Sequence, residues 1–288
     1  MIVPALFSRR SSLLFIAAYL SIGLSGTALA VIASDAPWVD STNSKARLIG
    51  GTVEIDGKLM LLAGVQMRMD DGWKTYWRYP GDSGVPPGFD WTGSKNLKSA
   101  EVLFPAPHRF VDGGGTAIGY SRDVVFPVKI TPERPGEPVE LKLVFDYGIC
   151  MDLCIPNEVN LSLTLPSDAT EDAKEASLLR ETLARVPKSE TPNALPRVAG
   201  IEAKLDGAAP RLRVEVLFDP DAAETDLFIS ADKTFVPVPK PLGTPDGGMQ
   251  SFEVAFGSAK EAAALKGKSL TLTLVSDRGS TETSWKAE

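Results

Sequence analysis

Runs of alternating apolar and polar residues dominate the chain between Leu48 and Leu165. Each run places apolar side chains at every second position, the period of a strand with one buried face. The clearest runs are residues 59–69, 124–130, 139–145 and 159–165. Segments rich in glycine and proline, residues 80–88 and 112–115, lie between them and disfavour helix. Short strands at this spacing predict an antiparallel β-sandwich.

The β pattern breaks over residues 167–186, where apolar residues recur at helical spacing. The helical positions are Ala173, Ala176, Leu179, Leu183 and Val186, with Ser167 or Thr170 as the N-cap. Pro187 ends the predicted helix, and residues 187–196 are typical of a proline-rich linker.

Alternating runs resume after the linker, at residues 211–218, 227–229, 252–256 and 270–275, with one short helix at 258–265. The second region holds no histidine cluster and no glycine-rich phosphate loop. The sequence therefore predicts an all-β protein with two antiparallel β-sandwich domains. Their predicted limits are 31–166 and 197–288, joined by a short helix and linker at 167–196.

Residues 1–30 have the pattern of a cleavable secretory signal peptide. Arg9 and Arg10 supply its positive start, Leu13–Leu24 is apolar, and Ala28–Ala30 fits a cleavage site. The apolar run is shorter than the ~20 residues of a spanning helix. We therefore expect an exported, periplasmic protein that does not span the membrane once the signal is removed.

Charge argues against nucleic acid as a partner. Without Arg9 and Arg10, 28 of the 30 basic residues remain against 37 acidic ones, a net charge of −9. Nucleic-acid binding calls for a basic surface. With only two cysteines in the chain, the fold must rest on hydrophobic cores and not on a disulfide framework.

The two cysteines, Cys150 and Cys154, are separated by three residues. In one extended strand they would lie about 13 Å apart, too far for a disulfide. A bond between them therefore needs a chain reversal, either a hairpin with residues 151–153 at its tip or a single helical turn. The strands on both sides and Pro156 favour the hairpin.

Three interpretations of this pair remain open. A structural staple is weakened by the small ring, which stabilises a fold by only about 2 kcal/mol in the chain-entropy model. A Cu(I) site could use both thiolates with Met151, although the Met67 and Met69 pair fits a core strand face. A redox-active dithiol is the preferred interpretation, because a bond that contributes little to stability can be opened and re-formed.

Several segments carry a family resemblance in the right order along the chain. They are residues 71–84, 86–91, 104–107, 118–120, 126–128 and 147–156. Together they make residues 48–165 resemble the periplasmic N-terminal domain of the DsbD/ScsB thiol:disulfide interchange proteins, with ScsB the closer branch. The ScsB-like branch implies tandem immunoglobulin-like domains.

The resemblance implies electron relay as a component of a protein-disulfide reductase. The pair would receive electrons from a membrane-embedded DsbD/ScsB-like donor and pass them to periplasmic thioredoxin-fold proteins, in settings such as cytochrome c biogenesis or copper tolerance. Cys154 would bond to partners and Cys150 would resolve the mixed disulfide. Tyr76 matches an aromatic residue beside the dithiol. No cofactor or metal is needed.

Two departures from the family are visible. The stretch that corresponds to an aromatic cap loop, residues 112–118, holds no aromatic residue, so Tyr120 or the glycine run would shield the dithiol. The chain also ends without the family's transmembrane and thioredoxin-like domains, so its electron donor would be a separate protein.

Asp152 either raises the pKa values of the two thiols by charge repulsion or is simply a residue that a tight turn favours. Cys150 and Cys154 are thus the predicted catalytic residues, supported by Tyr76, Tyr120 and Asp152. The alternatives are a non-catalytic partner-binding module with a structural disulfide and a Cu(I)-handling protein.

Overall fold

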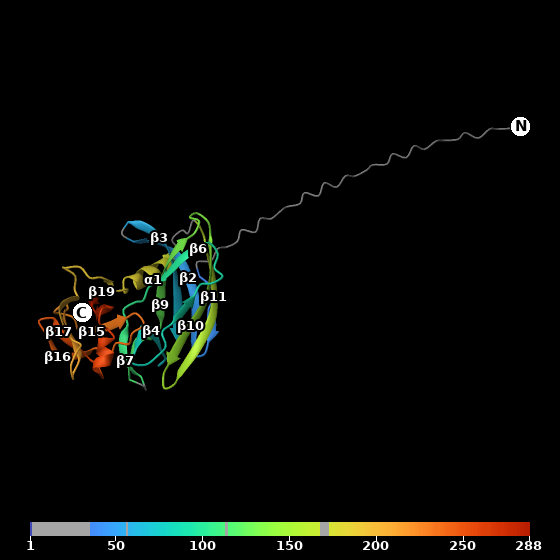
Figure 1. Ribbon diagram of the computed structural model, residues 1–288. Coiled ribbons are helices and arrows are strands. Elements are labelled where there is room, and N and C mark those ends of the chain that lie inside the picture. Colours follow the sequence, from blue (N-terminus) through green and yellow to red (C-terminus); the bar gives the residue numbers. More distant parts are fainter. Residues whose placement is uncertain (2–34, 56, 113–114, 168–172) are drawn as a thin grey trace. The chain divides into compact units, whose positions relative to one another are not determined.

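The computed structural model describes Met1 and residues 35–55, 57–112, 115–167 and 173–288. The predicted signal peptide, apart from Met1, lies outside these described residues. The described chain is built mainly of antiparallel strands, and its fold class is all-β with immunoglobulin-like sandwiches, as predicted (Figure 1). Within the described ranges, no helix has the length and apolar character needed to cross a bilayer.

The first sandwich consists of two antiparallel sheets. One has the strand order β1 (Val39–Ser41), β2 (Ser44–Ile55), β3 (Lys58–Met69), β9 (Val124–Pro132), β6 (Leu97–Val102). The other has the order β11 (Cys154–Leu165), β10 (Val139–Cys150), β4 (Lys74–Gly81), β8 (Gly115–Ser121), β7 (His108–Asp112), with β5 (Gly88–Asp90) also paired to β10.

Alternation along these strands builds the core between the two sheets. Leu141, Leu143 and Phe145 of β10 are buried against Phe126 of β9, because successive side chains of a strand point to opposite faces. Trp77 of β4 is fully buried in this core, and Met67 and Met69 lie there too. Trp73 and Trp91 pack half-buried against the same core.

Helix α1 (Ala173–Leu183) covers part of the outer face of the β2–β3–β9 sheet. Ala176 and Leu179 pack with Ile49 and Val125 in a separate small core. The contact depends on Gly64, where an added Cβ would come within 2.8 Å of a Leu179 methyl carbon. The helix ends earlier than predicted, at Leu183 and not at Val186, and the N-cap prediction at Thr170 lies outside the described residues.

The second sandwich also consists of two sheets. One has the order β12 (Lys188–Ser189), β19 (Gly279–Lys286), β18 (Ser269–Ser276), β15 (Thr225–Ala231); the other has the order β13 (Arg197–Lys204), β14 (Arg211–Leu217), β17 (Met249–Ala255), β16 (Lys240–Asp246). The predicted short helix is present as α2 (Ala259–Ala263), where the Ser258 hydroxyl accepts a hydrogen bond from the amide of Glu261.

The predicted linker is not a free connection. Its residues Lys188–Ser189 form β12, which pairs in parallel with β19, and the Glu190 amide donates to the Glu282 carbonyl 3.0 Å away. Near its end, the Thr281 hydroxyl donates to the Pro196 carbonyl at 2.6 Å. These bonds fix the segment to the second sandwich. The described residues of 32–288 form one compact unit.

Candidate functional site

Strands β10 and β11 form a long hairpin that brings the two cysteines together. Its ladder is unbroken from the pair Val139 and Leu165 to the pair Cys150 and Cys154. Residues 151–153 form the turn. The register follows from the apolar alternation of both strands, because a slip of one residue would turn every core side chain outward. The hairpin prediction for the cysteine pair is confirmed.

Cys150 and Cys154 are joined by a disulfide, and their Cα atoms lie 4.1 Å apart. The two residues differ in environment. Cys150 is only 3% exposed, whereas Cys154 at the start of β11 is exposed. A thiolate that attacks this bond from outside the protein therefore has access to Cys154 and not to Cys150.

Tyr76 of β4 lies beside the disulfide. Its hydroxyl oxygen is 3.1 Å from Cys154 Sγ, and because a disulfide sulfur carries no proton, the hydroxyl is the donor. The ring is almost fully buried between two glycines. An added Cβ at Gly84, whose φ is +109°, would come within 2.3 Å of the ring, and one at Gly148 within 3.3 Å. The predicted placement of Tyr76 next to the pair agrees with this geometry.

Phe110 supplies the aromatic cover that sequence analysis did not find. Tyr76, Ala117 and Cys150 form a small cluster on the outer face of the sheet, and Phe110 of β7 packs against it. The ring centroids of Phe110 and Tyr76 are 6.3 Å apart. The Lys74 ammonium lies 5.0 Å from the centre of the Phe110 ring, and Lys74 faces Cys150 in the β4–β10 ladder.

Three apolar side chains are exposed around the disulfide. Met151 and Leu153 are 46% and 72% exposed in the hairpin turn, and Val85 is 63% exposed in the segment that follows β4. Val85 lies close to Gly148, since an added Cβ there would be 3.7 Å from the Val85 Cβ. We call Val85, Met151 and Leu153 the apolar rim.

The sequence around this site is similar to that of a known protein family. The sequence model of the family described as thiol:disulfide interchange protein DsbD, N-terminal, matches residues 60–166, which include both cysteines and Tyr76. Residues 60–166 are therefore similar to the N-terminal domain of DsbD. No curated protein sequence matches the chain.

A solved structure shares the fold over a longer stretch. It is the crystal structure of the N-terminal periplasmic domain of ScsB from Proteus mirabilis, at 20% sequence identity and a TM-score of 0.66. The match covers 88% of this chain and 98% of that one, so it extends beyond residues 60–166 into the second sandwich.

Within the first sandwich, Tyr120 does not face the dithiol, and its prediction as a shielding or partner-facing residue is wrong. Tyr120 pairs with Thr75 across β8 and β4, which places its side chain on the inner face of the sheet. The ring lies 5.5 Å from that of Phe126, and the hydroxyl donates to the Pro105 carbonyl at 2.9 Å. Burial raises the pKa of Tyr120 well above its ordinary value.

The remaining sequence-predicted features lie at the ends of two hairpins. Asp152 is exposed in the turn between the cysteines. The stretch expected to correspond to the cap loop forms the end of β7 and the start of β8, with residues 113–114 outside the described residues. In the part of the chain that the structure describes, the aromatic side chain over the cluster is Phe110, two residues before that stretch begins.

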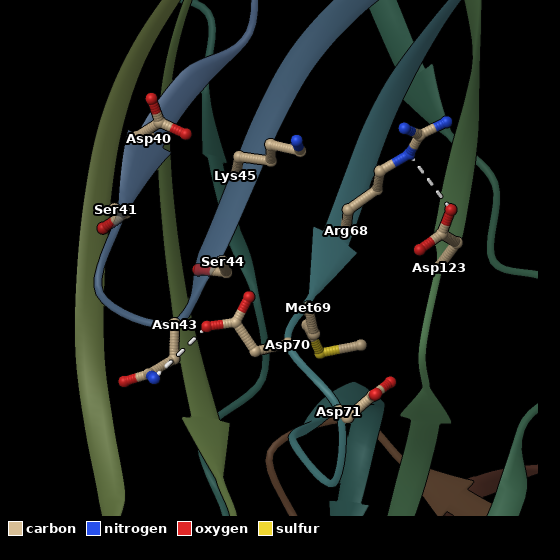
Figure 2. Close-up of a pocket in the computed structure, with 10 residues that line it drawn as sticks. All are labelled: Asp40, Ser41, Asn43, Ser44, Lys45, Arg68, Met69, Asp70, Asp71 and Asp123. Carbon is tan, nitrogen blue, oxygen red and sulfur yellow. Dashed lines mark hydrogen bonds and ion pairs between the residues drawn. The ribbon is translucent and has the colours of Figure 1, made fainter.

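A polar hollow of about 550 Å³ lies at the β2–β3 end of this domain (Figure 2). Two of its carboxylates are paired: Asp70 accepts from Asn43 Nδ2 at 3.3 Å, and Asp123 lies 3.1 Å from Arg68 Nε. In the described ranges, no cluster of three or more His, Cys, Asp or Glu residues is arranged to hold a metal ion. We assign no ligand to the hollow.

Proposed function

We propose that this chain exchanges disulfides with thioredoxin-fold proteins in the periplasm through Cys150 and Cys154. The observation that carries the proposal is the asymmetry of the pair at the hairpin tip, with Cys154 exposed and Cys150 buried. One accessible and one protected sulfur are the arrangement that an exchange through a mixed disulfide requires.

The proposed reaction has two steps. A thiolate of a reduced partner attacks Cys154 Sγ, which forms a mixed disulfide and releases Cys150 as a thiolate that takes up a proton. The partner's second thiolate then attacks the partner sulfur that is bonded to Cys154. A disulfide forms within the partner, and Cys154 leaves as a thiolate that takes up a proton from water. Two electrons thus pass to the chain, the partner's two thiols having released their protons to water, and the partner becomes oxidised. In the opposite direction, Cys154 attacks the disulfide of an acceptor and Cys150 resolves the product.

Tyr76 is suited to support the step in which Cys154 leaves. Its hydroxyl lies within hydrogen-bond distance of Cys154 Sγ already in the oxidised protein. A hydrogen bond to a charged acceptor is about twice as strong as one between neutral groups. The same hydroxyl therefore stabilises the Cys154 thiolate when it forms.

The apolar rim is suited to a protein partner. Exposed apolar side chains around a reactive group are typical of a contact surface, because their burial stabilises a complex. Val85, Met151 and Leu153 surround the disulfide, whereas a small thiol would need no such surface.

The finer role that we propose is a relay. Electrons would come from a membrane-embedded DsbD/ScsB-like donor and leave to soluble thioredoxin-fold acceptors. Support comes from the family description of residues 60–166 and from the periplasmic location named for the similar ScsB domain.

Trapping tests the proposal. A Cys150→Ala variant keeps the accessible sulfur but cannot resolve a mixed disulfide. Its Cys154 thiolate should displace thionitrobenzoate from a thioredoxin-fold protein that lacks its own resolving cysteine and carries thionitrobenzoate on the remaining one, and the covalent complex should accumulate. The complex is detected on a non-reducing gel and its bond located by mass spectrometry. The matched control is Cys154→Ala, which should trap little because Cys150 is buried.

A complex through Cys154 that dithiothreitol releases would support exchange. Equal trapping by both variants would contradict the assigned roles. If neither variant traps a partner, and the double Cys→Ser variant still binds one, the chain is a binding module with a structural disulfide.

A further inference from the structure

We infer that Arg109 is a positioning residue: by binding Asp226 of the second sandwich, it holds Phe110 over Tyr76 and Cys150. The consequence for reactivity rests on the proposed function, because it concerns access to the same disulfide. The inference also gives the second sandwich a role, which is to anchor the aromatic cover of the site.

The Arg109–Asp226 contact joins the two sandwiches through several bonds. Arg109 Nε donates to Asp226 Oδ2 at 3.0 Å, and Nη2 donates to Oδ1 of the same carboxylate. A third bond runs from Nη1 to the Pro239 carbonyl at 2.7 Å. Such a two-point contact fixes direction as well as distance. The Leu227 amide donates to Asp226 Oδ1 at 2.8 Å, which orients the carboxylate.

This contact acts on Phe110 through one short strand. Arg109 and Phe110 are adjacent in β7, so they point to opposite faces and a displacement of the strand moves both. In the described part of the sheet, β7 is an edge strand that pairs with β8 alone, with Arg109 opposite Ile118 and Phe110 opposite Ala117. The Arg109 contact supplies a second attachment that the ladder does not provide.

Strand β4, which carries Tyr76, is attached to the second sandwich in the same way. Arg78 Nη2 donates to the Thr273 hydroxyl at 3.2 Å and forms an ion pair with Glu282. The Tyr79 hydroxyl donates to the Val236 carbonyl and accepts from the Val236 amide at 2.9 Å. Both strands that cover the disulfide are therefore anchored within three residues of the covering side chain.

Packing between these anchors is continuous. The Trp77 ring lies 5.9 Å from Phe228 of β15, and the guanidinium of Arg109 lies 5.8 Å from the same Phe228 ring. Phe228 belongs to the hydrophobic core of the first sandwich although it comes from the second. A rigid contact of this kind is able to hold β4 and β7 in one arrangement.

The test is a double-mutant cycle between Asp226→Asn and Phe110→Ala, read out as the rate of reduction of the disulfide by dithiothreitol. Asp226→Asn keeps the shape of the side chain but weakens the two-point contact. We expect the rate to rise about fivefold in either single variant, because each uncovers the buried Cys150 side of the disulfide. In the Phe110→Ala background, Asp226→Asn should add no further increase, since its effect passes through Phe110.

Glu253→Gln is the matched control, because it disrupts an arginine–carboxylate pair within the second sandwich, where Arg213 Nε lies 2.7 Å from Glu253 Oε2. It should leave the rate unchanged. Arg109→Lys keeps the positive charge but cannot make both guanidinium hydrogen bonds to Asp226, so it should give an intermediate rate. A melting temperature for every variant identifies any that fail to fold.

Two results would overturn the inference: a wild-type rate in folded Asp226→Asn, or the same increase with and without Phe110. The assay uses no protein partner, so its result stands apart from trapping. If the double-mutant cycle fails but a partner is trapped, only the anchoring role of Arg109 is contradicted. If the cycle succeeds but no partner is trapped, only the proposed disulfide exchange is contradicted.

Discussion

The hydroxyl of Tyr76 lies 3.1 Å from the sulfur of Cys154, the exposed member of the disulfide. The phenol is held there by close packing of its ring against Gly84 and Gly148. A polar group with such restricted freedom is pre-organised for a negative charge on the neighbouring sulfur.

Tyr76→Phe should slow exchange without unfolding the protein. The variant keeps the buried ring and removes only the hydroxyl, so less of Cys154 is thiolate at neutral pH. We expect its reaction rate to fall by about threefold to tenfold, because the greater nucleophilicity of the remaining thiolate offsets part of the loss. The measurement is alkylation of the reduced Cys150→Ala protein by iodoacetamide at neutral pH. An unchanged rate would show that the Tyr76 hydroxyl does not stabilise the thiolate.

Leu153→Ser should weaken exchange with proteins and spare exchange with small thiols. Leu153 is 72% exposed at the hairpin tip, where it would be buried by a partner. We expect the second-order rate with a thioredoxin-fold protein to fall about fivefold, while reduction by dithiothreitol stays the same. Leu59→Ser is the control, since Leu59 is 75% exposed in β3. If the second-order rate falls equally in both variants, the apolar rim is not the surface that contacts the partner.

Removal of the disulfide should cost little stability. The ring it closes is short, so the double Cys→Ser variant should lose about 2 kcal/mol of unfolding free energy in the chain-entropy model. Denaturant titration of the oxidised protein and of the variant measures the difference. A loss of about 5 kcal/mol would instead favour a structural staple.

Alkaline pH should weaken the fold through Tyr79. Burial raises the pKa of Tyr79 to about 12, from an ordinary value of 10.0. The unfolded chain therefore releases this proton at lower pH than the folded protein. The contribution to stability is complete below pH 10 and is lost as the pH rises towards 12.

The measurement for Tyr79 is the unfolding free energy at pH 9 and at pH 11. Tyr79→Phe should show a smaller decrease between the two values than the wild type. The buried Tyr120, whose pKa is also raised, supplies a remaining decrease. If the unfolding free energy falls equally between pH 9 and pH 11 in Tyr79→Phe and in the wild type, Tyr79 is not a source of the alkaline loss of stability.

The sequence predicts the hairpin well because its information is local. Alternation on both sides of Cys150 and Cys154 sets the register, and the disulfide follows from it. The resemblance to a family added Tyr76, which alternation alone would have left as one more strand aromatic. Local patterns also predicted α2 at Ser258 and the core strands.

What the sequence did not predict depends on contacts between distant segments. Phe110 covers Tyr76 only because β7 and β4 both pair with β8, and the glycine run after it suggested a loop. Tyr120 was placed wrongly for the same reason, since its face is set by pairing with β4. Arg109 and Asp226 are 117 positions apart, and no local pattern links them.

Electron transfer between purified proteins tests the central claim most directly. Oxidised wild-type protein is mixed with one equivalent of a reduced thioredoxin-fold dithiol protein, quenched with an alkylating agent and analysed by mass spectrometry. The account predicts that Cys150 and Cys154 become alkylated while the partner loses an equal number of thiols. A disulfide that stays closed in the folded protein, with the partner still reduced, would contradict it.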